Sequence, residues 1–301
     1  LRGQFILTGS QKFTLMKNVS DSLAGRCVVL ELETLSFPEI MKQATSVMSF
    51  ADQCNILHRG MFPELWKDKS IPSDDYYRSY LATYLERDLR ELINVRSLRD
   101  FERFIRLCAT HNAQILNKTE LASAVGVKQN TINEWLSVLQ ASNQITLLEP
   151  FFENIGKRIV KTPKIYFNDT GLLCFLLNLS DLNLLTSSYT GFIWEAFVFS
   201  ELRKHIRNNG IKKEIYFYRD QQGREVDFFL WSQNSYHLIE TKWTEFVDSN
   251  DLKNIYELEK IIISKKHEAE VSKMLVSRTS NKYKTDRNIS VINGFVVSEE
   301  I

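Results

Sequence analysis

The sequence predicts a multidomain α/β protein, and its 301 residues suffice for about two or three domains. After about residue 184, runs typical of strands alternate with helix-like segments, and this alternation predicts an α/β domain at 184–301. Between residues 76 and 183, apolar residues recur at helical spacing, which predicts a mainly helical part. A hydrophobic content of 44% is sufficient for packed cores.

Composition narrows the classes of partner. The formal net charge is +1, so a surface that binds nucleic acid must be local. No run approaches the ~20 apolar residues of a membrane span and no signal peptide is visible, so we expect no membrane partner. The four cysteines are dispersed, with no paired spacing. We therefore expect reduced thiols in a cytoplasmic protein and no zinc site.

The opening segment, residues 1–40, combines two strand-like runs with a helix-like run. Strands are predicted at Phe5–Leu7 and Cys27–Leu32, and a helix is predicted from near Ser10 to Gly25. The segment contains LTGS, then SLAGR, then LSFPE. In these motifs it resembles the last third of an AAA-type ATPase domain of prokaryotes, similar to archaeal ATPases.

The resemblance implies a nucleotide site in the opening segment. Thr8 or Ser10 would sense the γ-phosphate of ATP, and Arg26 would contact the nucleotide; the alternative for Arg26 is a surface position at a strand edge. No G-x-x-x-x-G-K-[ST] phosphate loop occurs in the sequence. The resemblance implies a lost N-terminal part with the phosphate loop, so we expect either a fragment or a degenerate gene. We expect ATP binding only in the intact protein, and proteins of this resemblance often self-associate.

Residues 41–75 predict a connector between the opening segment and the helical part. Residues 74–92 then place tyrosines and leucines at helical spacing, which predicts a helix with one face in a core. This helix, together with the later segments NIGKR, KIYFNDTGLLCFLL and EVDF, resembles the uncharacterised domain that usually follows this type of ATPase domain. The resemblance spans nearly the whole chain.

Residues 117–151 predict a winged helix, in a part bounded at about 100–153. A short helix at Leu121–Val125 precedes a turn at Gly126, and a second helix follows with an apolar stripe. The polar residues lie on the outer face, opposite this stripe, where they can contact the bases and phosphates of DNA. They are Lys128, Gln129, Asn130, Asn133 and Ser137.

A basic cluster follows the predicted wing, which begins at Gln144–Leu148. Such a cluster fits contact with phosphates. Glu134 on the second helix argues mildly against DNA, and winged helices also serve as protein-docking scaffolds. We expect DNA as the partner, with protein docking as the alternative. The cluster consists of Lys157, Arg158, Lys161 and Lys164.

Residues 191–205, GFIWEAFVFSELRKH, predict a helix with an apolar stripe that includes Glu195. A carboxylate on an apolar face needs a partner, because burying an unpaired charge is costly. Glu201 lies on a different face, beside Trp194 and Val198, and we expect it to be solvated.

Residues 224–243 predict a β-hairpin with a two-residue turn at 233–234. In this register Asp227 lies opposite Glu240, with Cβ atoms ~5 Å apart, and Glu225 lies opposite Lys242 on the same face. Two unpaired carboxylates in an apolar hairpin would repel each other and raise a pKa.

Two kinds of compensation are open. One is a structural ion pair with Lys242, assisted by Arg219 or Arg224. The other is a divalent cation, with Mg²⁺ the first candidate, because Mg²⁺ binds one or two carboxylates with water and phosphate oxygens. In that case Lys242 would stabilise developing charge on a phosphodiester.

Asp227, twelve intervening residues and Glu240-Thr241-Lys242 resemble the D…(D/E)-x-K signature of the PD-(D/E)xK, or restriction-endonuclease-like, superfamily. Families of this kind usually add a glutamate from a preceding helix, and Glu195 matches that position. The resemblance implies a restriction-endonuclease-like α/β fold for 184–301. It also implies metal ligands at Asp227, Glu240 and Glu195, with Lys242 as the catalytic cation.

The remaining elements complete the predicted C-terminal domain. A strand is predicted at Ile215–Arg219, a helix at Leu252–Ser264, and strands at Lys273–Ser277 and Val291–Val297, with a polar loop at 278–290.

Three functions follow as hypotheses. The first is a Mg²⁺-dependent nuclease domain, tethered to a DNA-binding winged helix and controlled by an ATPase domain. The second is an ATP-regulated binding module whose nuclease fold does not cut. The third is an oligomerisation platform.

Overall fold

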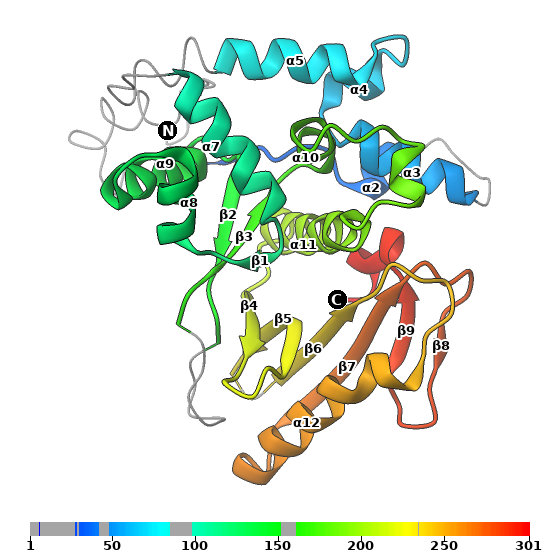
Figure 1. Cartoon of the computed structure of the whole chain (residues 1–301). Helices are drawn as coiled ribbons and strands as arrows, with labels where there is room; N and C mark the ends of the chain where they lie inside the picture. The colour runs from blue at the N-terminus through cyan, green and yellow to red at the C-terminus, as the bar shows by residue number, and fades with distance from the viewer. Residues whose placement is uncertain are drawn as a thin grey trace.

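The computed structural model describes residues 6, 28, 30–41, 48–84, 98–151, 161–233 and 235–301. These residues form a three-stranded sheet of order β1-β3-β2 and a six-stranded sheet of order β4-β5-β6-β7-β9-β8, with helices around both. In Figure 1 the small sheet and most helices occupy the upper part and the large sheet the lower part. The predicted mixed α/β class is confirmed.

Short helices begin the described part of the chain. α3 starts at a capping box of Ser49 and Asp52, and it lies with α4 in the segment predicted as a connector. This segment is more than a linker, because the apolar residues of α3 and α4 join the main core. α5 matches the helix predicted from residue 74, and its Tyr77 and Leu81 are buried as expected. The bounds are α2 (Phe37–Met41), α3 (Phe50–Arg59), α4 (Pro63–Lys67) and α5 (Ser73–Thr83).

The predicted strand at Cys27–Leu32 is wrong for the residues described there. Val28, Leu30 and Leu32 lie outside any strand and are 84–95% exposed. A strand needs a neighbour for its backbone groups, and none of the described strands pairs with these residues. An apolar run alone was therefore insufficient evidence for a strand.

The small sheet forms with the helices predicted beside it. Asn117 caps the start of α8, and Gly126, at φ 84°, ends it in the left-handed conformation that favours glycine. The predicted apolar stripe of α9 is buried, as Ile132 and Trp135 show. In chain order the elements are α7 (Leu98–Thr110), β1 (Gln114–Ile115), α8 (Lys118–Val125), α9 (Gln129–Ala141), β2 (Ile145–Leu148) and β3 (Lys164–Phe167).

Helices α10 (Thr170–Leu176) and α11 (Thr190–Asn208), with the 3-10 helix η2 (Asn183–Leu185) between them, connect the two sheets. α11 confirms the helix predicted at 191–205 and is buried on nearly all sides. None of the helices in the described ranges has both the length and the apolar character that crossing a membrane would require.

The large sheet contains the predicted hairpin. β5 and β6 pair in the register that the sequence predicted, in which Ser232 lies opposite Ser235 and Phe228 lies opposite Ile239. β6, β7 and β9 run parallel, whereas β4, β5 and β8 are antiparallel to their neighbours. The strands are β4 (Glu214–Arg219), β5 (Glu225–Ser232), β6 (Ser235–Thr241), β7 (Glu270–Ser277), β8 (Tyr283–Lys284) and β9 (Ser290–Asn293).

Two predictions near the C-terminus need correction. The strand predicted to reach Val297 ends at Asn293, whose side chain accepts a hydrogen bond from Phe295 N and so caps the 3-10 helix η4 (Gly294–Glu299). The loop predicted at 278–290 contains the short strand β8.

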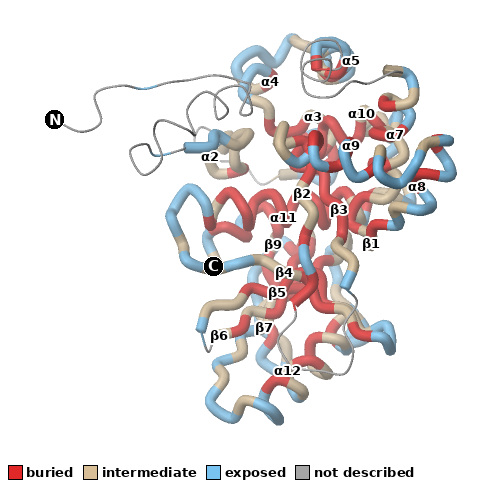
Figure 2. Tube along the Cα trace, turned by 90° about the vertical axis from the view of Figure 1, so that its left-hand side faces the viewer, coloured by how far each residue is buried: buried red, intermediate tan, exposed pale blue. Residues whose placement is uncertain are grey.

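Helices cover both faces of the large sheet. Phe228 and Ile239 pack with α11 in one apolar cluster. Their neighbours Phe229 and Leu238 pack in a second cluster with α12 (Lys253–Lys265), which follows the 3-10 helix η3 (Ser249–Leu252). Neighbouring residues of a strand point to opposite faces, so α11 and α12 lie on opposite sides. Figure 2 shows the buried residues concentrated along α11 and the strands.

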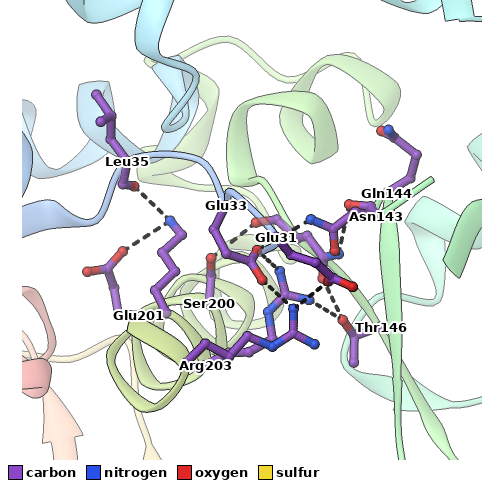
Figure 3. A network of polar contacts seen from close by, with 12 residues as sticks. Glu31, Glu33, Leu35, Asn143, Gln144, Thr146, Ser200, Glu201 and Arg203 are labelled. Atoms are coloured by element: carbon purple, nitrogen blue, oxygen red, sulfur yellow. Dashed lines mark hydrogen bonds and ion pairs between the residues drawn. The ribbon is translucent and has the colours of Figure 1, made fainter. Parts of the chain in front are cut away.

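Charged contacts fix the segment before α2 to α11 (Figure 3). Arg203 of α11 forms an ion pair with Glu33 and donates a 2.5 Å hydrogen bond to Thr146 of β2. Arg207, half exposed, lies 2.6 Å from the other oxygen of Glu33. Burial lowers the pKa of Arg203 to about 10, in spite of the Glu33 charge. The segment is thus held by a buried ion pair.

Glu201 contributes a second contact, and its predicted exposure is wrong. It is 1% exposed, accepts a 2.8 Å hydrogen bond from Phe37 N and pairs with Lys204 at 3.3 Å. Lys204 also donates to the Leu35 carbonyl at 2.8 Å. Because α11 is buried on nearly all sides, its apolar stripe did not reveal which polar residues were solvated.

Replacing Arg203 with methionine tests the weight of this contact. Arg203→Met leaves Glu33 buried without its main partner, so the free energy of unfolding should fall by about 3 kcal/mol. Arg207→Met is the matched control, because its pair with Glu33 is half exposed and should contribute less than about 1 kcal/mol. Urea denaturation measures both. Equal losses would contradict this account.

Candidate functional site

The candidate site lies between the two sheets, and its centre is the ammonium group of Lys164. Lys164 begins β3, and its side chain is 2% exposed. Its Nζ lies 3.0 Å from Glu195 Oε1, 2.5 Å from Glu225 Oε1 and 3.8 Å from Asp227 Oδ1. Burial acts to lower the pKa of Lys164, but the charges of the three carboxylates outweigh it and raise that pKa.

A short backbone link brings the small sheet to this place. Phe151 N donates to Phe217 O at 2.8 Å, and Phe217 N donates to Glu149 O at 3.2 Å. The chain just after β2 therefore pairs with β4 of the large sheet, next to the bridge between Pro150 and Phe217. This pairing, together with the packing of α11 on β3, places the first residue of β3 beside β5.

Glu195 has a second partner in the same strand. Tyr166 donates its hydroxyl to Glu195 Oε1 at 2.6 Å. Burial, followed by the charge of Asp227, raises the pKa of Glu195 to about 7, against the opposing effects of Lys164 and Tyr166. Near neutral pH this carboxyl group is therefore partly protonated, which reduces the repulsion within the cluster.

Asp227 is oriented by the neighbouring strand. Its Oδ2 accepts hydrogen bonds from Thr241 N at 2.8 Å and from Thr241 Oγ1 at 2.9 Å. The pairing of β4 with β5 shifts beside it, because Tyr216 pairs with Phe229 whereas Tyr218 pairs with Val226. Such a bulge interrupts the regular alternation of side chains and re-aims those next to it.

Glu240 is the least satisfied carboxylate of the group. It is 6% exposed, and Lys242 Nζ lies 2.8 Å from its Oε1. Its Oε2 is buried and has no hydrogen-bond partner among the described residues. Burial and the charge of Asp227 raise the pKa of Glu240 well above its usual range, against the effect of Lys242. The side chain of Lys242, 37% exposed, connects this buried group to solvent.

The structure brings together the four residues predicted for the C-terminal site. The charges of Asp227 and Glu195 both act on Glu240, and Lys242 is paired with it. Glu225 does not face Lys242 as the hairpin register predicted. It pairs with Lys164 and, at 2.8 Å, with Arg219, because the bulge changes the direction of side chains at this end of β5.

Lys164 is the functional residue that sequence reasoning missed. It was assigned to a surface cluster for phosphates, whereas it is buried among carboxylates. The run Lys164-Ile165-Tyr166-Phe167 contained one signal, since a lysine that begins a fully buried strand needs an acidic partner. Nothing in the sequence indicated which partner, because Glu195 and Asp227 are 31 and 63 positions away.

Within the part of the chain that the structure describes, the charges in the cluster do not balance. There the four carboxylates of Glu195, Glu225, Asp227 and Glu240 pair with three cations, Lys164, Lys242 and Arg219. Fully ionised, these described residues are short of one positive charge. A proton on Glu195 or Glu240 supplies it, as their raised pKa values indicate.

A small cation is the other means of supplying this charge. In the described ranges no three His, Cys, Asp or Glu residues are grouped so as to hold a metal ion, and Glu195 is engaged by Lys164 and Tyr166. The expected three-carboxylate centre is therefore not formed. The unpartnered Oε2 of Glu240 beside Asp227 fits a Mg²⁺ ion held by two carboxylates and water.

The other predicted site residues fall into two groups. Lys128, Gln129, Asn130 and Asn133 are exposed together at the start of α9, and Lys161 is exposed after the predicted wing. Outside the described residues lie Thr8, Ser10, Arg26, Lys157 and Arg158.

The raised pKa of Glu195 makes the free energy of unfolding depend on pH. Because its value is about 7 when folded and about 4.5 ordinarily, the folded state binds the proton more tightly. The free energy of unfolding should therefore fall as pH rises from about 4.5 to about 7, by roughly 3 kcal/mol for this group. Glu195→Gln should remove that part of the fall. Urea denaturation at pH 5 and pH 7.5, with a chelator present, measures the free energy of unfolding of both proteins. An equal fall in the variant and the wild type would contradict this role of Glu195.

Comparison with known families places these features along the chain. Residues 1–41 match an AAA domain, on the segment for which an AAA-type resemblance was predicted. Residues 51–183 match a domain of unknown function (DUF8612), and residues 190–294 match a second domain of unknown function (DUF4143). An AAA segment followed by the latter domain is typical of AAA-ATPase-like proteins and indicates an ATPase-associated protein.

Curated relatives come from bacteria and archaea. The chain is 33% identical over 229 residues to the uncharacterized proteins Rv2008c of Mycobacterium tuberculosis and Mb2031c of Mycobacterium bovis, a match that covers 75% of this chain and 49% of each relative. It is 26% identical over 274 residues to the uncharacterized protein MJ1544 of Methanocaldococcus jannaschii, covering 85% of this chain and 58% of the relative. The chain thus spans about half the length of the curated relatives it matches.

Proposed function

We propose that this chain is the nucleic-acid-processing part of an ATPase-associated protein, in which the large sheet carries a Mg²⁺-dependent phosphodiester site of the restriction-endonuclease-like type. The observation that carries the proposal is the pair of buried carboxylates on adjacent strands, Asp227 and Glu240, in a cluster whose described residues are short of one positive charge. ATP would act through the AAA part of an intact protein.

The residues of the cluster have distinct tasks in this proposal. Asp227, fixed by Thr241, and Glu240, whose Oε2 has no partner among the described residues, would hold Mg²⁺. When bound, Mg²⁺ polarises a phosphodiester and lowers the pKa of a bound water. Lys242 reaches solvent beside Glu240 and would stabilise the negative charge that develops on the phosphate. Lys164 and Tyr166 would keep Glu195 in place behind them.

The small sheet and its helices support DNA as the substrate. The order α7, β1, α8, α9, β2, β3 with sheet order β1-β3-β2 agrees with a winged helix. In the winged-helix proposal α9 is the recognition helix; Lys128, the residue just before it, is exposed, as are Asn130 and Asn133 in its first turns. The asparagine amides suit base edges, and the lysine suits a phosphate.

Plasmid nicking tests the catalytic proposal. Protein incubated with Mg²⁺ or Mn²⁺ and supercoiled plasmid should nick it, and Asp227→Ala and Lys242→Ala should each lower the rate at least a hundredfold. Lys260→Ala is the matched control, because Lys260 is an exposed lysine of α12 on the opposite face of the sheet. Nicking that persists in both site variants would show a contaminating nuclease and refute the proposal.

A binding module that does not cut is the second candidate, and Lys164 favours it. Its ammonium is 2.5–3.8 Å from three carboxylates and compensates part of their charge without a metal ion. A proton on Glu195 or Glu240 supplies the charge that is still missing. The cluster would then be structural, and the winged helix would bind DNA or a protein under the control of ATP. Specific DNA binding without nicking would support this second candidate.

The α9 surface gives a test that both candidates share. Asn130→Ala combined with Asn133→Ala should weaken duplex DNA binding about tenfold or more through lost base contacts. Lys128→Ala should remove one phosphate contact, so the slope of the logarithm of the binding constant against the logarithm of the salt concentration should fall by about one. Fluorescence anisotropy at several salt concentrations measures both effects. Unchanged affinity and salt slope would exclude α9 as the DNA-binding surface.

A further inference from the structure

A second cationic feature lies at the same edge of the large sheet as the carboxylate cluster. The guanidinium of Arg278 lies 4.2 Å from the ring centroid of Phe50 and 4.6 Å from that of Trp243. Phe50 begins α3 and Trp243 follows β6, so segments almost two hundred residues apart hold one arginine between two aromatic rings. Contacts of this kind fix the plane of a guanidinium group.

Within the described ranges, no carboxylate forms an ion pair with the guanidinium of Arg278, and its buried Nε has no hydrogen-bond partner. Burial lowers the pKa of Arg278, and the charge of Glu245 acts against this effect, but that carboxylate accepts a hydrogen bond from Ser280. An oriented arginine with unused donors suits a phosphate group, which it binds through two parallel hydrogen bonds.

Parallel strands bring Arg278 to the candidate site. β6 and β7 are parallel, Thr241 pairs with Val276, and Lys242 N donates to Val276 O at 2.9 Å. Lys242 and Arg278 therefore leave the carboxyl ends of adjacent strands. In open α/β sheets this edge is where ligands bind. A phosphate on Arg278 would lie along the path that leads to Lys242 and Glu240.

An exposed aromatic ring adjoins this basic pair. Phe246 is 83% exposed, and its loop is attached to Arg278, since Arg278 N donates to Thr244 O at 2.8 Å and Thr244 Oγ1 donates to Phe246 O at 2.8 Å. An aromatic ring beside cations is the combination that proteins use to bind single strands, with bases stacked on rings and phosphates on the cations.

We propose that Phe246, Trp243 and Arg278 form a binding site for single-stranded nucleic acid, which leads an unpaired strand to Lys242. Arg278 binds a phosphate, and Phe246 stacks on a base. This inference rests on the proposed function for its direction toward Lys242, but strand binding itself requires neither a metal ion nor cleavage.

Binding of a fluorescent oligothymidylate by the full chain, in EDTA, tests the site apart from catalysis. Phe246→Ala and Arg278→Gln should each weaken binding about tenfold, and Arg278→Gln should also lower the salt slope by about one contact. Phe246 is so exposed that its replacement should leave the fold intact. Arg287→Gln is the matched control, because Arg287 lies 4.7 Å from the ring of Tyr256 and is exposed.

The possible outcomes separate this site from the catalytic proposal. Weakened binding in both variants, with the control unchanged and without any nicking in Mg²⁺, supports the strand site and refutes catalysis. Affinity unchanged in Phe246→Ala overturns the inference, whatever Arg278→Gln does. An equal loss for duplex DNA of the same length also overturns it, because paired bases are not free to stack on Phe246.

Discussion

The buried ammonium of Lys164 is the interaction on which the arrangement of this protein depends. It joins β3 of the small sheet to α11 and to β5 of the large sheet through three carboxylates. A lysine that is 2% exposed is tolerated only with such partners, and those carboxylates in turn need a cation. The two sheets therefore cannot separate without leaving unpaired charges, and Glu195 and Asp227 keep Lys164 as a partner only while the sheets are joined.

α11 connects this site to the segment that matches an AAA domain. Glu195 lies in its first half, whereas Arg203, Lys204 and Glu201 hold residues 33–37 with its second half (Figure 3). One rigid, buried helix thus contacts both the carboxylate cluster and the chain that leads from the ATPase-like part. A shift of α11 would move Glu195 relative to Lys164, which gives a physical route by which an ATPase domain could affect the site.

Local patterns predicted much of the site, and long-range contacts account for what they missed. The hairpin register and the grouping of Asp227, Glu240 and Lys242 followed from strand alternation and a two-residue turn. The role of Lys164 did not, because its partners come from α11 and β5 and depend on a bulge that no sequence pattern marked. Glu201 was misplaced for a related reason, since a helix covered on all sides has no solvent face to identify.

In the proposed function, a divalent cation supplies the positive charge that the cluster around Glu240 lacks among the described residues. Thermal unfolding with increasing Mg²⁺ or Mn²⁺ at pH 8 tests it most directly, because a ligand that binds only the folded state raises the Tm. The Tm of the wild-type chain should rise with cation concentration, and that of the Asp227→Asn, Glu240→Gln double variant should not. A wild-type Tm that does not respond, or the same rise in the double variant, would contradict the account.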